Sequence, residues 1–185
     1  MAVLLTSIES RAAEIEDVPF PNIVEAGSHR LPLFGLGLLR YRVLFRGYVG
    51  GLYLPPGAAS GIALQDVPKA LELYYFWDIE GRLFGQAADE LLARSLPPER
   101  IAQLRPRLER LHALYQDVEA GDRYRLSYAP GNGTTLSLNG APLGTIPGAD
   151  FAQVYFGIWL GPDPLNEAFR DQLFERLPRE ASLLQ

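Results

Sequence analysis

The sequence predicts an α+β fold in which helices pack on one face of an antiparallel sheet. Strand-like and helix-like segments occur in separate runs along the chain instead of alternating, which favours an antiparallel sheet with segregated helices. Residues 123–128 and 134–138 alternate between polar and apolar side chains, as half-buried strands do. Asn139-Gly140 is the strongest two-residue hairpin signal in the chain, and it leads into a short strand at 142–146.

Residues 1–20 are expected to form an N-terminal arm or a short edge element, because they show only a weak helical pattern. One domain is expected over residues 21–185, since the chain has the length of a single domain and no break in composition. Between residues 22 and 33, polar and apolar residues mix around Gly27, which predicts a short pair of strands.

Residues 35–54 are rich in glycine and apolar side chains, and they predict a long hairpin with its turn within 43–47. Arg40 interrupts this pattern. A guanidinium is almost never buried without an anionic or hydrogen-bonding partner, so Arg40 either reaches water or awaits a ligand. In a straight strand Arg40, Arg46 and Tyr48 share a face, and a hairpin turn would place Arg40 and Tyr48 within side-chain reach.

The middle of the chain predicts a buried strand followed by two helices. Residues 70–79 are rich in aromatic side chains and have the length of a strand. Asp78 can then cap a helix over about 80–95. Prolines open a second helix at residue 97, which is expected to run towards Val118 with a kink at Pro106.

Two more helices are expected after the last strand. Asp150 can cap a helix that runs through Trp159, and Asp163-Pro164 can start a final one that reaches about Leu177.

Charge and composition exclude a nucleic-acid-binding face. The formal net charge is −5, and Lys69 is the only lysine. Nucleic-acid binding needs a clustered excess of positive charge. The one local cluster of arginines is interleaved with glutamates at helical spacing, which is typical of a solvated helix face. Its members are Arg100, Arg105, Arg107 and Arg110.

Several kinds of chemistry are also excluded. The chain has no cysteine, so disulfides, thiolate metal sites and cysteine nucleophiles are absent. Its two histidines, His29 and His112, have no second metal ligand at useful spacing, and no serine lies in a Gly-x-Ser-x-Gly motif. The loop around Gly131 joins two strands instead of opening a helix, so it lacks the geometry that holds a phosphate. We therefore expect neither a metal nor a cofactor.

The sequence also bears on the compartment. The N-terminus has no basic region, and charges at Glu9 and Arg11 interrupt its short apolar start, so it is not a secretory signal as written. No apolar run approaches the length of about 20 residues that spans a bilayer. A cytoplasmic location is expected, and a periplasmic one stays open if a leader has been removed.

A set of short segments has a common order and spacing over about residues 20–175. They are Gly35-x-Gly37-x-x-Arg40, Tyr48-Val-Gly-Gly-Leu-Tyr53-Leu54, Asp66-Val-Pro68-Lys69, Gly121-Asp122, Asn139-Gly140, Gly144-Thr-Ile146, Asp150-Phe151 and Gly157-Ile-Trp159-Leu-Gly161. Together they resemble the chalcone isomerase-like family, and look closest to its bacterial branch.

The resemblance implies an open-faced β-sandwich with a ligand cleft between the sheet and the helices. In the plant enzymes of this family, the arginine at the place of Arg40 stabilises the anionic oxygen of a chalcone during an intramolecular, cofactor-independent ring closure. Tyr48 stands where those enzymes have a threonine, and the polar residues of their following helix have no counterpart here. Only the arginine carries over.

An arginine and a phenol in an apolar cleft suit a carboxylate whose acyl tail fills the cleft, as in the fatty-acid-binding branch of the fold. We therefore expect a protein that binds a fatty acid or a similar amphiphilic anion without catalysis. The predicted ligand-binding residues are Arg40, Tyr48, Tyr41, Phe84, Leu91, Tyr155 and Trp159.

Three alternatives stay open at this point. The protein could be an intramolecular lyase or isomerase that acts on a phenolic enone, with Arg40 and Tyr48 as catalytic residues. Arg40 could instead form a structural pair with a carboxylate or with carbonyls at a strand end, while the aromatic residues simply pack. The chain could also be an interaction module whose cleft is filled by side chains. The oligomeric state is open.

Overall fold

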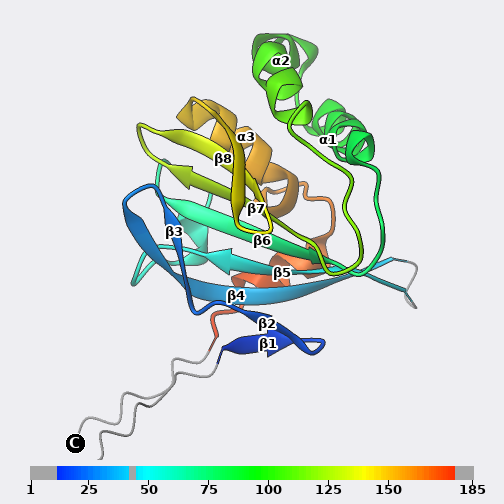
Figure 1. Cartoon of the computed structure of the whole chain (residues 1–185). Helices are drawn as coiled ribbons and strands as arrows, with labels where there is room; N and C mark the ends of the chain where they lie inside the picture. The colour runs from blue at the N-terminus through cyan, green and yellow to red at the C-terminus, as the bar shows by residue number, and fades with distance from the viewer. Residues whose placement is uncertain (1–11, 42–44, 178–185) are drawn as a thin grey trace, which may run out of the picture.

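The computed structural model describes residues 12–41 and 45–177, with the backbone but not the side chains of Tyr41 and Phe45. Within these residues, seven strands form one curled antiparallel sheet, and each pairs with the next along the chain (Figure 1). They are β3 Ile23–Ala26, β4 His29–Tyr41, β5 Phe45–Tyr53, β6 Lys69–Tyr75, β7 Arg123–Ala129, β8 Gly133–Leu138 and β9 Ala141–Ile146.

The predicted hairpins are present in this sheet. The segment 35–54 forms the β4–β5 pair, and the short strand pair predicted at 22–33 is β3 with the start of β4. The turn predicted within 43–47 falls partly on residues 42–44, which lie outside the described residues. A 3-10 turn, η1 Ser60–Ile62, lies in the connection from β5 to β6.

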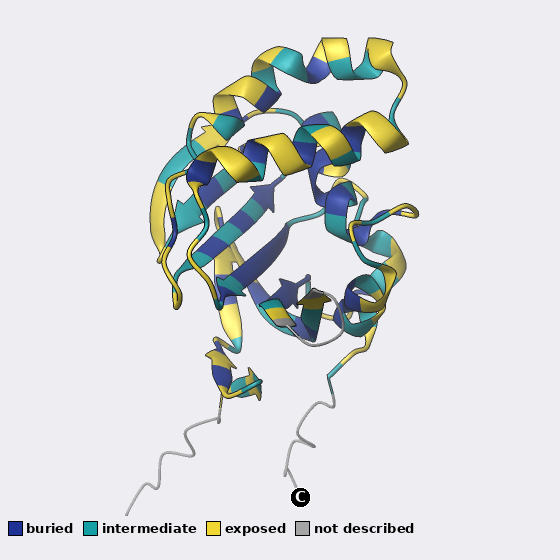
Figure 2. Ribbon diagram, turned by 90° about the vertical axis from the view of Figure 1, so that its right-hand side faces the viewer, coloured by how far each residue is buried: buried dark blue, intermediate teal, exposed yellow. Residues whose placement is uncertain are grey.

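Four helices of the described chain pack on one face of the sheet, which we call the inner face. They are α1 Gly81–Ser95, α2 Pro98–His112, α3 Ala149–Leu160 and α4 Glu167–Phe174. The upper two helices in Figure 2 are α1 and α2, largely exposed on their outward sides, and the buried residues of all four join the inward side chains of the sheet in one core. The expected α+β fold is therefore confirmed. None of these helices has both the length and the apolar character needed to cross a bilayer.

The opposite, outer face carries a small hairpin made of β1 Ala13–Ile15 and β2 Val18–Phe20 (Figure 1). Phe20 is fully buried there and packs in a cluster with Val49 of β5. This hairpin falls inside the predicted N-terminal arm, whose first eleven residues lie outside the described part of the chain. The division into an arm and a domain stays a prediction.

The start of α1 differs from the sequence prediction. Asp78 does not cap this helix, because its Oδ1 accepts a hydrogen bond from the Ala120 N–H at 2.9 Å. The cap comes from a residue distant in sequence: the Gly81 N–H donates to Oδ1 of Asp117 at 2.8 Å. The side chain of Asp117, which follows α2 in the chain, thus accepts a hydrogen bond from an N–H in the first turn of α1 that has no partner within the helix.

Two other helix ends also need correction. The second helix ends at His112 instead of near Val118, because Val118 forms a β-bridge with Ile79. The last helix is shorter than predicted: it begins after Asn166, whose side chain caps it, and not at Asp163-Pro164. The end of the second helix depends on where the chain returns to the sheet, whereas the start of the last helix follows from the local cap by Asn166.

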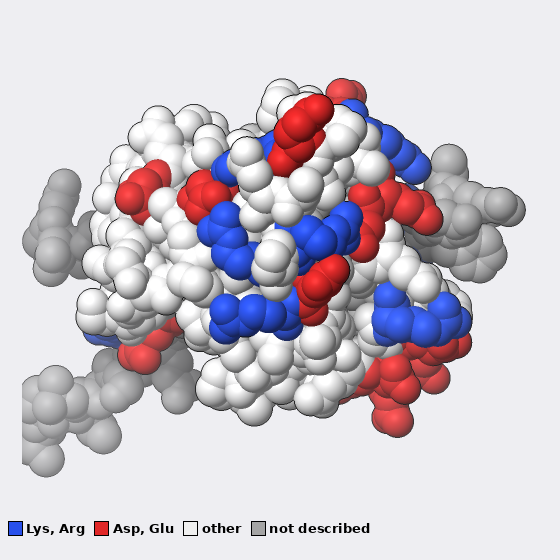
Figure 3. Space-filling view, turned by 90° about the horizontal axis from the view of Figure 1, so that it is seen from above, with Lys and Arg blue, Asp and Glu red and all other residues white. Residues whose placement is uncertain are grey.

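Three arginines of α2 form ion pairs with neighbouring helices, in addition to facing solvent as predicted. Arg107 and Arg100 donate to Asp150 in the first turn of α3 at 2.7 and 3.1 Å, and Arg105 donates to Asp89 of α1 at 2.8 Å. The Arg107 hydrogen bond holds the pKa of the Asp150 carboxyl well below its ordinary value. Figure 3 shows basic and acidic side chains interspersed on this surface. The pairs tie α2 to both α1 and α3.

Glycines on the inner face allow α4 to lie directly on the strands. A Cβ atom added to Gly37 of β4 would lie 3.0 Å from the ring of Phe169 in α4. One added to Gly50 of β5 would lie 2.7 Å from the same ring. Phe169 is fully buried against these two positions, so the space that the glycines leave is filled by an aromatic ring.

The outer face contains a buried carboxylate. Glu72 of β6 is 2% exposed, and its two oxygens accept hydrogen bonds from Arg123 Nη1 at 2.8 Å and Arg125 Nε at 2.7 Å. Arg123 also donates to the Pro19 carbonyl at 2.8 Å, which connects this cluster to the β1–β2 hairpin. Because charged groups are costly to bury without partners, the three side chains depend on one another.

We predict that Gly50→Ala lowers the free energy of unfolding by about 1–3 kcal/mol, because the new methyl group collides with Phe169 and overpacks the core. Gly157→Ala in α3 is the matched control. A Cβ there would have no neighbour within 4 Å, and alanine is more favourable than glycine inside a helix by about 1 kcal/mol. Urea denaturation measures both. Equal effects of the two substitutions would contradict the proposed close contact of α4 with the sheet.

We also predict that Glu72→Gln destabilises the protein by about 3 kcal/mol, because two partly buried guanidinium groups lose their counter-charge. Glu80→Gln removes a carboxylate from an exposed pair with Arg82 and should cost under about 1 kcal/mol. Both values come from urea denaturation at neutral pH. A cost for Glu72→Gln no larger than that of the control would show that the cluster does not stabilise the sheet.

Candidate functional site

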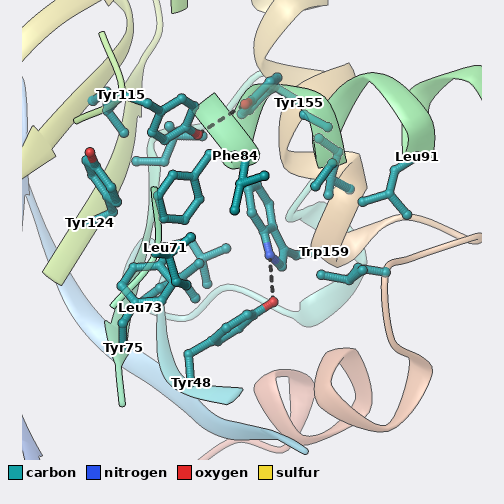
Figure 4. A pocket seen from close by; sticks show the side chains of 18 residues that line it. Tyr48, Leu71, Leu73, Tyr75, Phe84, Leu91, Tyr115, Tyr124, Tyr155 and Trp159 are labelled. Carbon is teal, nitrogen blue, oxygen red and sulfur yellow. Dashed lines mark hydrogen bonds between the residues drawn. The ribbon is translucent and has the colours of Figure 1, made fainter. Parts of the chain in front are cut away.

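An apolar cavity of about 260 Å³ lies between the inner face of the sheet and the helices. Residues of β5, β6, β7 and β8 line it from the sheet, and residues of α1, α3 and the segments beside them line it from the other side (Figure 4). Among the 18 lining residues, all of them described, none carries a charge. The cavity therefore suits an apolar group with at most a few hydrogen bonds.

The floor of the cavity, which is its sheet side, is made of side chains at alternate positions of the strands. Leu71, Leu73 and Tyr75 of β6 point inwards, while Glu72 between them points to the outer face. Pairing with β7 brings Leu126 beside Leu71 on the same inner face. The floor is thus a regular array of side chains that the register of two central strands fixes.

Tyr48 and Trp159 meet in the cavity. Trp159 Nε1 of α3 donates a hydrogen bond to the Tyr48 hydroxyl of β5 at 3.1 Å (Figure 4). An indole N–H can only donate, so the Tyr48 oxygen is the acceptor and its own hydrogen is not used in this bond. Tyr48 therefore has an O–H group that can donate to a bound molecule.

Three other phenols are hydrogen-bonded at the far side of the cavity. The hydroxyls of Tyr115 and Tyr155 lie 3.1 Å apart, and either can be the donor, so one of the two hydrogens stays available (Figure 4). Tyr124 donates to the Gln116 carbonyl at 2.9 Å and accepts from the Gln116 N–H at 2.7 Å. Its hydroxyl is thus used by the backbone.

The phenols of the cavity are neutral. Burial raises the pKa of Tyr48 far above its ordinary value of 10.0, although the hydrogen bond from Trp159 works in the opposite direction. Burial likewise raises the pKa of Tyr75, Tyr115 and Tyr155. The cavity therefore offers uncharged hydroxyl groups and not phenolates at physiological pH.

Most of the predicted ligand-binding residues lie together. Tyr48, Phe84, Leu91, Tyr155 and Trp159 all line the cavity. The side chain of Tyr41 lies outside the described residues, so its predicted role is not placed.

Arg40 lies on the opposite face of the sheet from the cavity. Its guanidinium is 3.4 Å from Glu16, which follows β1, and its side chain is 51% exposed. Arg46 reaches the other oxygen of Glu16 at 3.5 Å. The structure therefore gives Arg40 an acidic partner, as in the structural alternative, and does not bring it together with Tyr48. A ligand role for Arg40 stays a prediction that this geometry does not support.

A β-bulge explains the separation. Leu39 pairs with Tyr48, but Arg40 pairs with Arg46, so Gly47 is an extra residue on β5. Residues that pair across an antiparallel ladder share a face, and an extra residue moves the following side chains to the other face. Tyr48 consequently points inwards with Leu39, while Arg40 and Arg46 point outwards.

Sequence reasoning missed three phenols of the cavity, namely Tyr75, Tyr115 and Tyr124. Tyr75 and Tyr124 lie at inward positions of predicted strands, so strict period-two counting along each strand would have selected them. Tyr115 follows the end of α2 in an irregular segment, where no periodic signal exists. Tyr115 lines the cavity because the chain turns back towards β7 after α2.

A helix-covered antiparallel sheet with an uncharged cavity between the layers defines an open-faced β-sandwich with an internal apolar cavity. A family model described as chalcone isomerase-like matches residues 12–175. The chain therefore belongs to the chalcone isomerase-like family, as its sequence motifs indicated.

The structure is similar to the crystal structure of a fatty-acid binding protein from Arabidopsis thaliana. The TM-score is 0.63 at 14% sequence identity, and the match covers 85% of this chain and 91% of that one. At this identity the likeness shows the fold alone. No curated protein matches the chain by sequence.

His112 is the last residue of α2 and faces α1. Gly85 of α1 packs against its ring, where a Cβ would lie 2.8 Å from Cγ, and its Nδ1 is 3.9 Å from Asp89 Oδ2. Its buried Nε2 has no hydrogen-bond partner among the residues that the structure describes. Burial lowers the pKa of His112, and the nearby Asp89 partly opposes this effect.

We predict that His112 makes stability fall at acidic pH. Its folded-state pKa lies below the ordinary 6.5, so the unfolded chain binds the proton more readily. The contribution of neutral His112 to the free energy of unfolding is complete above pH 6.5 and is lost as the pH falls through the folded-state pKa. Urea denaturation between pH 5 and 8 should show a stability difference between wild type and His112→Gln that shrinks below pH 6.5. A difference that stays constant with pH would contradict this.

Proposed function

We propose that this protein binds a fatty acid or a similar amphiphile in the cavity, without chemical turnover. The observation that carries the proposal is the cavity itself, which is lined by apolar side chains and offers the Tyr48 hydroxyl as a hydrogen-bond donor. An acyl chain would fill the apolar part, and its polar end would meet Tyr48. The similarity to a fold relative that is a fatty-acid binding protein supports this reading.

The lack of turnover is supported by the position of Arg40. Stabilising an oxyanion during ring closure needs a donor aimed at the developing charge. Arg40 pairs with Glu16 on the outer face, and the described residues that line the cavity include no cation. The alternative, an intramolecular lyase or isomerase of the chalcone isomerase type, would have to rely on neutral phenols alone.

The size of the cavity restricts the ligand. Its volume of about 260 Å³ lies just below the roughly 300–1,000 Å³ that is common for small-molecule sites. Leu83 and Leu165 are among its lining residues and are 39% and 41% exposed, so they mark the side that opens to solvent. We therefore propose a medium-length acyl chain, with longer chains extending through this opening.

A single tryptophan can report binding. The chain has two tryptophans, Trp159 in the cavity and Trp77, which is 55% exposed. Trp77→Phe leaves Trp159 as the only indole, so titration with decanoic acid at pH 5.5 should change its fluorescence in a saturable manner. Native mass spectrometry of the untreated protein then tests for a co-purified ligand. No saturable change and no bound ligand would reject the proposed function.

We predict that Ala87→Phe weakens this binding by at least roughly tenfold, because Ala87 is an exposed lining residue of α1 and a ring there would obstruct the opening of the cavity. Gln86→Phe is the matched control: the neighbouring residue is exposed and does not line the cavity, so its substitution should leave binding within about threefold. Equal loss in both variants would place the ligand elsewhere.

Two further measurements separate the proposal from its alternatives. Arg40→Gln tested in the same titration would, if binding were lost, place the ligand on the outer face beside Glu16. Incubation of the protein with a hydroxylated chalcone tests for catalysis. Ring closure above the uncatalysed rate that disappears in Tyr48→Phe would favour the isomerase.

A further inference from the structure

The hydroxyl groups that line the cavity still have hydrogens to donate to a bound molecule. The indole N–H of Trp159 is already donated to Tyr48, and the Tyr48 oxygen accepts it, so the O–H hydrogen is what this pair has left to offer. The Tyr115–Tyr155 pair likewise uses one hydrogen and leaves the other. In Figure 4 the Tyr48 hydroxyl points towards Trp159, and the hydroxyls of Tyr115 and Tyr155 face each other farther along the cavity. A ligand that satisfies them must bring an acceptor.

Among the residues that the structure describes, none that lines the cavity is a cation that could balance a negative ligand. The titratable groups that line the cavity are five tyrosines, Tyr48, Tyr75, Tyr115, Tyr124 and Tyr155. On the inner face the nearby cation is Lys69, two residues before Leu71, but its Nζ donates to the Gln65 carbonyl at 2.6 Å and lies 4.9 Å from the centre of the Tyr128 ring. Lys69 does not line the cavity, and neither does Asp89 of α1, which binds Arg105.

We infer that the cavity selects an amphiphile whose polar end is an uncharged hydrogen-bond acceptor, such as a ketone, an ester or an undissociated carboxylic acid, and disfavours the carboxylate. This inference rests on the proposed function and specifies its ligand class. A carboxylate would have to leave water for an apolar space without a counter-charge, which is costly, whereas a carbonyl oxygen loses little and gains the Tyr48 hydrogen bond.

The phenols that line the cavity already show this bias. Burial raises the pKa of Tyr48 and Tyr155, which means that the surroundings disfavour negative charge at both sides of the cavity. A ligand carboxyl placed beside Tyr48 experiences the same surroundings, so its own pKa rises on binding. A fatty acid consequently takes up a proton when it enters.

Three ligands with similar chains test the inference: decanoic acid, methyl decanoate and 2-undecanone. Their affinities are measured by Trp159 fluorescence in the Trp77→Phe protein between pH 5.5 and 8. The ester and the ketone should bind with a pH-independent affinity, which also controls for effects of pH on the protein. The affinity of the acid should fall about tenfold for each pH unit, because one proton is bound with it.

The outcomes separate this inference from the proposed function. Binding of the acid at pH 8 as tight as that of the ester, or with no dependence on pH, overturns the inference while the proposed function stands. Binding of none of the three ligands overturns both. Ester and ketone binding that is at least roughly tenfold tighter than acid binding at pH 8 supports both.

A pair of variants tests the role of the Tyr48 hydroxyl. Tyr48→Phe should weaken 2-undecanone binding by roughly three- to tenfold, which is the effect of losing one neutral hydrogen bond. Tyr74→Phe makes the same chemical change on the outer face of β6 and should leave the affinity unchanged. Unchanged affinity in Tyr48→Phe would overturn the assignment of this hydroxyl as the donor, and thermal unfolding of both variants shows whether they are folded.

Discussion

The side chains of each strand alternate between the inner and the outer face of the sheet, and the rest of the structure depends on this division. On β6, Leu71 and Leu73 line the cavity, while Glu72 between them binds Arg123 and Arg125 on the outer face. A slip of one residue would expose the leucines and turn the carboxylate into the core, so the register of β6 is strongly specified. The absence of charge from the lining of the cavity therefore follows from strand register as much as from composition.

The cavity exists because the helices approach the sheet unequally. At β4 and β5, glycines let α4 come down onto the strands, and Phe169 fills the space. At β6 and β7, large inward side chains such as Tyr75 and Leu126 lie between the strands and the helices, and the gap that stays open is the cavity. The ion pairs from α2 to α1 and α3 hold the covering helices to one another on the outside of this gap.

The fold was predictable because its signals are local. Alternation within strands, the Asn139-Gly140 turn and the prolines before α2 each act over a few residues, and the hairpins follow from them. The helix ends were not predictable in the same way. Asp117 caps α1 from 36 residues away, and nothing in the local sequence favours it over Asp78.

The site was predictable only in part. Tyr48, Phe84 and Trp159, which the sequence predicts as ligand-binding residues, line the cavity because aromatic side chains on the inner periods of a strand or helix lie against the core. Arg40 lies apart from Tyr48 because a single bulge at Gly47 exchanges the faces of the hairpin on either side of it. A bulge needs only one extra residue in the ladder, and its position cannot be counted from periodicity alone.

The covering helices α1 and α2 have a simple topological origin. They belong to one excursion of the chain between β6 and β7, which are neighbours in the sheet and pair directly with each other. The excursion is closed at its base by the bridge of Ile79 with Val118 and by the hydrogen bond that the Gly121 N–H donates to the Tyr75 carbonyl at 2.9 Å. The ladder is thus complete without it. Insertions, deletions or whole replacements of this helical hairpin can alter what the cavity admits while the sheet keeps its strand order, so ligand range and sheet architecture can diverge independently in descendants of this chain.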